Sequence, residues 1–253
     1  DILRHPNNIL AIEYIKAIKK YKLPLRPYVI KRTSDNHSSL NTDNSFCSSS
    51  AIRNILYKND AFYSPTFEKL VPETTLGILK NSPISKPVFF DDFYPFLVYK
   101  LLSDRLRLSD YYEVNESLAN RINNISILPE TFNELLDILS GKQITNARIR
   151  RCLLNIVLNR TNGKINRLFK NEYIKYIRIL GVKNDSTELL RDMKNKCPVP
   201  LINKTASYRG RLNNAGIEMF ETEIFENNLY RQVFYNKYGI ALPTDYEQSV
   251  IIR

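Results

Sequence analysis

The residues best suited to bind phosphate lie at the end of a polar segment that covers positions 33–50. Ser48-Ser49-Ser50 stands directly before Ala51-Ile52-Arg53, which opens a helical pattern. Serine at a helix start caps the helix, and the first backbone N–H groups then face outward, where they can bind an anion. Arg53, one turn further on, could reach the same anion through two hydrogen bonds. The segment alone fits a plain capped helix with a surface arginine at least as well.

Three further positions could contact a nucleotide. Lys31-Arg32 ends a β-branched run, and open parallel sheets bind ligands beyond the carboxyl ends of their strands. Asn7, near a helix start, could hydrogen-bond to adenine or ribose, or simply cap the helix. His37 lies within the polar segment, where a histidine is more often solvated than catalytic.

A cationic stretch between residues 148 and 178 suggests contact with RNA. It holds nine Lys and Arg side chains and one acid, Glu172, and Tyr173 and Tyr176 could stack on bases. A solvated helix face is the alternative interpretation. The candidate RNA-binding residues are Arg148, Arg150, Arg151, Arg160, Lys164 and Arg167.

Other familiar chemistry has no support in the sequence. The HExxH, GxxxxGK[ST], GxSxG and GxGxxG motifs are all missing. Cys47, Cys152 and Cys197 are scattered without a CxxC pair, so we expect neither a metal site nor a disulfide framework. Asp91-Asp92 precedes a helical pattern and suits capping better than catalysis.

Composition is that of a globular protein that attracts polyanions. The net charge is +11 and the hydrophobic fraction is 43%, enough for a core. Nucleic acid is the first candidate partner, and we expect a cytoplasmic location, because the scattered cysteines fit a reducing compartment. No apolar run is long enough to span a bilayer. The oligomeric state stays open.

The elements that must position these residues change in character along the chain. A helix over 6–21 and a strand over 27–32 predict the end of an α/β domain. Short strands are predicted within 176–182 and 199–202. The later helices are expected at 90–102, 115–122, 131–139, 146–158, 187–194 and 217–235. The predicted class is α+β and predominantly helical: the C-terminal end of a Rossmann-like nucleotidyltransferase domain over 1–60, then a mostly helical domain over 61–253.

Taken together, these segments resemble the tRNA(Met) cytidine acetate ligase family, within the nucleotidyltransferases that carry an HxGH motif. Pro6-Asn7-Asn8-Ile9-Leu10 is similar to the family's PN-[DN]-IL segment, and Ser48-Ser49-Ser50-Ala51-Ile52-Arg53 is similar to its SASAIR. Segments 27–32, 147–154, 176–181 and 198–204 follow in the family's order.

The resemblance implies an activity and a set of contacts. Family members use ATP, with Mg²⁺, to convert acetate to acetyl-AMP, and they then acetylate N4 of the wobble cytidine of elongator tRNA(Met). The ATP-binding positions implied for this sequence are Asn7, Arg32, Ser49, Ser50 and Arg53. The second domain is expected to bind the tRNA.

Two departures from the family pattern limit what the resemblance implies. The family's Gly-x-x-Tyr-His-Asp loop here reads Ser34-Asp35-Asn36-His37-Ser38. The HxGH motif is expected upstream of Asp1, so the catalytic residues are unknown and the 253 residues alone are expected to be inactive. The alternatives are a non-catalytic basic RNA-binding module and an HxGH nucleotidyltransferase acting on a small molecule.

Overall fold

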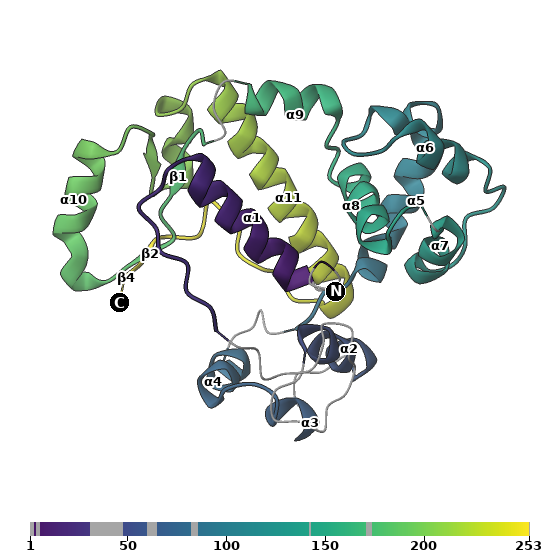
Figure 1. Ribbon diagram of the computed structural model, residues 1–253, viewed down its shortest axis with the longest axis horizontal. Helices are drawn as coiled ribbons and strands as arrows, with labels where there is room; N and C mark the ends of the chain where they lie inside the picture. Colours follow the sequence, from purple (N-terminus) through teal and green to yellow (C-terminus); the bar gives the residue numbers. More distant parts are fainter. Residues whose placement is uncertain are drawn as a thin grey trace. The chain divides into compact units, whose positions relative to one another are not determined.

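The computed structural model divides into two compact units, Asp1–Ser85 and Lys86–Arg253. It describes residues 3, 6–30, 48–59, 65–81, 86–141, 143–170 and 174–252 (Figure 1). The assignment of ATP binding to residues 1–60 and of tRNA binding to residues 61–253 stays a prediction.

The first unit contains four described helices. They are α1 (Pro6–Lys20), α2 (Ser49–Asn59), α3 (Pro65–Glu68) and α4 (Glu73–Asn81). The first two were predicted from apolar spacing and the serine cap; the last two were not predicted.

The strand predicted over residues 27–32 is wrong for its described part. Residues 27–30 form no strand, and Tyr28, Val29 and Ile30 are 83–89% exposed. A β-branched run becomes a strand only when a neighbouring strand supplies a ladder of hydrogen bonds, and no described residue does so here. Lys31 and Arg32 lie outside the described residues.

The second unit begins with a helical core. Its elements are η2 (Phe90–Phe93), α5 (Tyr94–Ser103), η3 (Arg105–Asp110), α6 (Glu116–Asn123), α7 (Phe132–Leu139) and α8 (Asn146–Val157). The apolar faces of α7 and α8 meet here, with Leu135, Leu139, Ile149 and Leu153 fully buried. This arrangement confirms the four helices predicted between residues 90 and 158.

Side-chain caps fix where three of these helices begin. The side chain of Asn115 accepts a hydrogen bond from the amide of Leu118, and Thr131 and Thr145 cap α7 and α8 in the same way. Each cap satisfies an amide that the helix itself leaves without an acceptor.

The remainder of the second unit surrounds one long helix, α11 (Asn214–Tyr238). The other helical elements are α9 (Asn162–Phe169), η4 (Asn184–Ser186), α10 (Thr187–Lys196) and η5 (Thr205–Gly210). Strand β1 (Ile177–Arg178) pairs in parallel with β3 (Leu201–Ile202), and β2 (Gly181–Val182) pairs in parallel with β4 (Ile251–Ile252). The predicted class, mostly helical with short strands, is confirmed, whereas β4 was not predicted.

A second, smaller core lies under the β1–β3 pair. Ile202, Tyr208 and Phe220 are buried in it, and the rings of Tyr208 and Phe220 stack with centroids 4.6 Å apart. Within the described part of the chain, no helix is long and apolar enough to cross a membrane.

Candidate functional site

The start of α2 has the geometry of an anion-binding helix end. Ser48 is 1% exposed, its Oγ accepts from the amide of Ala51 at 3.1 Å, and its carbonyl accepts from the amide of Ile52 at 3.1 Å. The predicted serine cap is thereby confirmed. The amides of Ser49 and Ser50 come before the amides of Ala51 and Ile52 in the chain, and a helix offers no acceptor to its first amides.

Arg53 extends from the next turn of the same helix and is exposed. The first-turn amides and hydroxyl groups of Ser49 and Ser50 and the guanidinium of Arg53 are donors of the kind that phosphate groups accept from. Binding of ATP by Ser49, Ser50 and Arg53 stays a prediction. Asn7 is exposed in the first turn of α1, and Arg32 lies outside the described residues, so their place beside Ser49, Ser50 and Arg53 stays a prediction.

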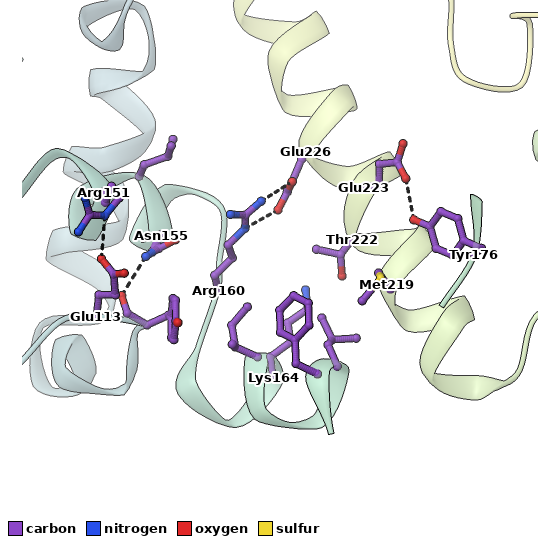
Figure 2. A pocket seen from close by; sticks show the side chains of 15 residues that line it. Glu113, Arg151, Asn155, Arg160, Lys164, Tyr176, Met219, Thr222, Glu223 and Glu226 are labelled. Carbon is purple, nitrogen blue, oxygen red and sulfur yellow. Dashed lines mark hydrogen bonds and ion pairs between the residues drawn. The ribbon is translucent and has the colours of Figure 1, made fainter. Parts of the chain in front are cut away.

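A cleft of about 450 Å³ in the second unit contains part of the predicted RNA surface (Figure 2). Its walls come from α8, α9 and α11. Of the six candidate RNA-binding residues, Arg151, Arg160 and Lys164 line it, together with Glu113, Glu223 and Glu226. The floor is apolar and includes Leu154, Ile165, Leu168 and Met219.

Acidic partners engage three of the six candidate cations. Arg160 forms a two-pronged pair with Glu226, with both N···O distances at 2.7 Å. Arg151 pairs with Glu113 and Arg167 with Glu218, each at 3.1 Å. These acids lie 38 to 66 residues away in the sequence, so local charge counting could not reveal them.

The other three candidates are placed differently. The guanidinium of Arg150 lies over the rings of Phe90 and Phe132, 5.8 and 5.6 Å from their centroids. Arg148 is exposed, and Lys164 is half-buried beside the cleft. Contact between the six residues and RNA stays a prediction.

Two polar residues of the cationic stretch have structural roles instead. Asn155 is 7% exposed, and its amide donates to the carbonyl of Tyr112 at 3.0 Å. The hydroxyl of Tyr176 donates to Glu223 at 2.6 Å, and its ring meets Phe220 edge-on. Burial, and then the carboxylate of Glu223, raise the pKa of the Tyr176 phenol. Tyr173 lies outside the described residues.

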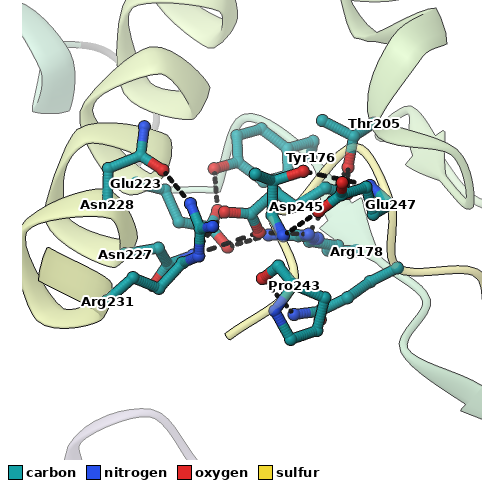
Figure 3. Close-up of polar contacts among 12 residues, drawn as sticks. Tyr176, Arg178, Thr205, Glu223, Asn227, Asn228, Arg231, Pro243, Asp245 and Glu247 are labelled. Atoms are coloured by element: carbon teal, nitrogen blue, oxygen red, sulfur yellow. Dashed lines mark hydrogen bonds and ion pairs between the residues drawn. The ribbon is translucent and has the colours of Figure 1, made fainter. Parts of the chain in front are cut away.

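Arg178 is at the centre of a polar network that the sequence did not reveal (Figure 3). Its guanidinium donates to Glu223 at 2.7 Å and to Asp245 at 2.6 Å. Thr205 donates to the carbonyl of Asp245 at 2.8 Å, and Asn227 donates to its carboxylate. The network joins β1, α11 and the C-terminal segment, so the charge of Arg178 is engaged within the fold.

The Asp91-Asp92 pair belongs to a helix start. The carboxylate of Asp92 accepts from the amide of Phe89 at 2.6 Å and pairs with Lys237 at 3.1 Å, as its capping interpretation predicts. Among the described residues, no group of three His, Cys, Asp or Glu side chains could hold a metal ion.

Comparison with known proteins identifies relatives over almost the whole chain. The model of the HIGH Nucleotidyl Transferase family matches residues 1–242. The tRNA(Met) cytidine acetate ligase of Thermoanaerobacter sp. (strain X514) is 34% identical over 93% of the chain, and that of Acetivibrio thermocellus is 30% identical over 100%. The chain spans 57% and 62% of the lengths of these two relatives.

Two solved structures share the fold. The crystal structure of Thermotoga maritima TmcAL (apo, form I) has a TM-score of 0.82 at 22% sequence identity, covering 99% of this chain and 62% of that one. The same protein bound with alpha-thio ATP has a TM-score of 0.80, also at 22% identity, covering 99% of this chain and 60% of that one.

Proposed function

The chain belongs to the HIGH nucleotidyl transferase family, and from this we propose that it works in an ATP-dependent tRNA(Met) cytidine acetate ligase. The observation that carries the proposal is its likeness to curated proteins of that name, one of them 34% identical over 93% of the chain. The substrates would be ATP, with Mg²⁺, acetate and elongator tRNA(Met).

The proposed reaction has two steps. A carboxylate oxygen of acetate attacks the α-phosphorus of ATP, forming acetyl-AMP and releasing pyrophosphate. The N4 amine of the wobble cytidine then attacks the acetyl carbonyl, and AMP leaves. For this attack the base must leave its stack.

The start of α2 would serve the first step. Negative charge builds up on the departing pyrophosphate, and donors already fixed in position stabilise such charge without reorganising. The amides of Ser49 and Ser50 and the guanidinium of Arg53 are such donors. Arg32 is proposed to contact a phosphate as well, and Asn7 to contact the adenine or ribose.

Calorimetric titration of the 253-residue chain with ATP tests the nucleotide site. We expect binding that weakens at least tenfold in Arg53→Ala and in Arg32→Ala, because each removes a charge-assisted contact to phosphate, about 1.5–3 kcal/mol. Lys58→Ala is the control, since Lys58 lies in the last turn of the same helix. Equal binding by the three variants would contradict the nucleotide site.

Titration with tRNA separates the alternative functions. A chain that binds tRNA but never ATP would be a non-catalytic RNA-binding module, which the charge of +11 favours as the second candidate. A chain that binds ATP but not tRNA would point to a small-molecule substrate.

We also expect that these 253 residues bind tRNA without making acetyl-AMP. The sequence has two histidines, His5 and His37, and neither stands in an HxGH motif. Pyrophosphate release from ATP and acetate, measured by a coupled assay, would contradict this expectation.

A further inference from the structure

A second groove in the Lys86–Arg253 unit differs in charge from the cleft of Figure 2. It has a volume of about 470 Å³ and lies between α10 and the two parallel strand pairs. Its cations are Arg191, Lys194 and Arg211, and none of its lining residues is acidic. Three cations and three glutamates line the cleft of Figure 2, so their charges offset one another there. The groove therefore has the more positive lining of the two.

The floor of the groove follows from strand alternation. Arg178 and Ile202, in the paired strands β1 and β3, face α11, where they join the polar network and the second core. Successive side chains of a strand point to opposite faces, so Ile179 and Leu201 face the other way and line the groove. Apolar side chains from β2 and β4 extend this floor, among them Val182 and Ile252.

One face of α10 forms the wall. Leu190, Arg191 and Lys194 line the groove, and Lys194 follows the other two by four and three residues, the spacings that share a helix face. Lys196 does not line it, and its amine instead pairs with Asp192 at 2.9 Å. The helix therefore directs two of its cations into the groove and keeps a third on another face.

The groove is built on anchored segments. The guanidinium of Arg211 donates to the carbonyl of Leu201 at 3.2 Å, which fixes its charge at the floor. Strand β4 is paired with β2, and Asp245, six residues before Ile251, is held by Arg178 (Figure 3). Arg211 and the strands of the apolar floor are therefore held in place before any ligand arrives.

We propose that this groove binds an unpaired nucleotide of the tRNA. Its phosphate would contact Arg191, Lys194 and Arg211, and its ribose and base would lie on the aliphatic floor. The size is that of sites for small ligands, roughly 300–1,000 Å³, which excludes an intact duplex. Unpaired RNA presents phosphates and splayed bases together, as the mixed lining requires. This proposal rests on the proposed function, because it takes RNA as the partner.

Binding measurements on matched variants of α10 test the proposal. Fluorescence anisotropy with elongator tRNA(Met) and the full 253-residue chain would compare Arg191→Gln, Lys194→Gln and the control Lys196→Gln. We expect each groove variant to bind about two- to fivefold more weakly, and the salt slope, log K against log[salt], to fall by about 0.7–0.9 for each lost phosphate contact. The control should keep the wild-type affinity and slope.

Equal behaviour of the three variants would overturn the proposal while leaving tRNA binding, and thus the proposed function, intact. Failure of the wild-type chain to bind tRNA would overturn both. Circular dichroism melting confirms that each variant is folded before it is compared.

Photo-crosslinking provides a second measurement, independent of charge removal. A tRNA carrying 4-thiouridine should crosslink to peptides that span Ile179–Val182 or Leu190–Lys194. Crosslinks confined to α8 and α9 would overturn the proposal, as would competition by polyglutamate as strong as that by unpaired RNA of equal charge.

Discussion

Arg160 and Glu226 form a two-pronged ion pair that ties the connection between α8 and α9 to the middle of α11, with both N···O distances at 2.7 Å. The backbone of Arg160 is held as well, because its carbonyl accepts from the amide of Tyr112 at 2.8 Å. The charge of this arginine is therefore already used within the fold. A residue predicted from sequence as a contact for RNA has a structural role in addition.

Replacing this arginine should cost stability. We expect Arg160→Ala to lower the free energy of unfolding by about 1–3 kcal/mol, because it removes both hydrogen bonds and leaves a half-buried carboxylate unpaired. The matched control is Arg167→Ala, which removes a single-pronged pair with the arginine side chain 66% exposed and should cost less than about 1 kcal/mol. Urea denaturation measures both; equal losses would contradict this interpretation.

Replacing Arg178 should lower the free energy of unfolding more than replacing Arg160. Its side chain is 15% exposed and that of Asp245 is 6% exposed. Arg178→Ala leaves the carboxylates of Glu223 and Asp245 without their shared cation, and breaking a buried pair in this way costs roughly 3–5 kcal/mol. Arg178→Lys keeps the charge but not the two-sided geometry and should fall between Ala and wild type. Thermal melting gives the order, and a lysine variant less stable than the alanine variant would contradict it.

Asp104 makes the free energy of unfolding depend on pH in the acidic range. A hydrogen bond from Lys100, and then one from Tyr111, hold the pKa of the Asp104 carboxyl below its ordinary value of 3.8. The unfolded chain thus binds this proton more readily than the folded one. The stabilisation is complete above about pH 4 to 5 and is lost as the pH falls through the depressed folded pKa.

Urea denaturation between pH 5 and pH 2.5 checks this dependence. The free energy of unfolding should fall less steeply with acid in Asp104→Asn than in wild type, because the variant has no proton to bind there. Asp137→Asn, which changes an exposed aspartate of α7, should keep the wild-type slope. Parallel curves for wild type and Asp104→Asn would exclude the assignment.

Local signals in the sequence were sufficient for most of the longer helices, whereas α3, α4 and α9 were not predicted. The apolar spacing of Ile149, Leu153 and Ile156 predicted the buried face of α8, and the caps at Thr131 and Thr145 lay at or beside the predicted helix starts. Such features depend on residues within one or two turns. A strand depends on a partner elsewhere in the chain, and so residues 27–30, with β-branched composition alone, misled the prediction.

In the candidate sites, too, contacts between residues close in sequence could be predicted, and contacts between distant residues could not. The cap of Ser48 could be predicted because donor and acceptor lie three residues apart. The partners of Arg160 and Arg178 could not, because they come from α11 and from Asp245, 45 to 67 residues away. Local counts of charge show how many cations a segment carries, and only the fold shows which of them acids have already engaged.

Removing an acid of α11 that pairs with a candidate RNA-binding cation of α9 should strengthen binding to RNA. Glu218 engages Arg167, whose side chain remains 66% exposed. Glu218→Gln removes one negative charge near a proposed phosphate contact and releases the guanidinium, so we expect tRNA affinity to rise about two- to fivefold at low salt.

The control for this change is Glu221→Gln, which removes the same charge from α11 one turn away, where it pairs with Arg209 instead. If the α8–α9 surface contacts RNA, Glu218→Gln should exceed this control, and adding Arg167→Gln should cancel the gain. Anisotropy titrations at two salt concentrations measure the difference. Equal gains in tRNA affinity from the two variants would show only the effect of net charge and would contradict contact between Arg167 and RNA.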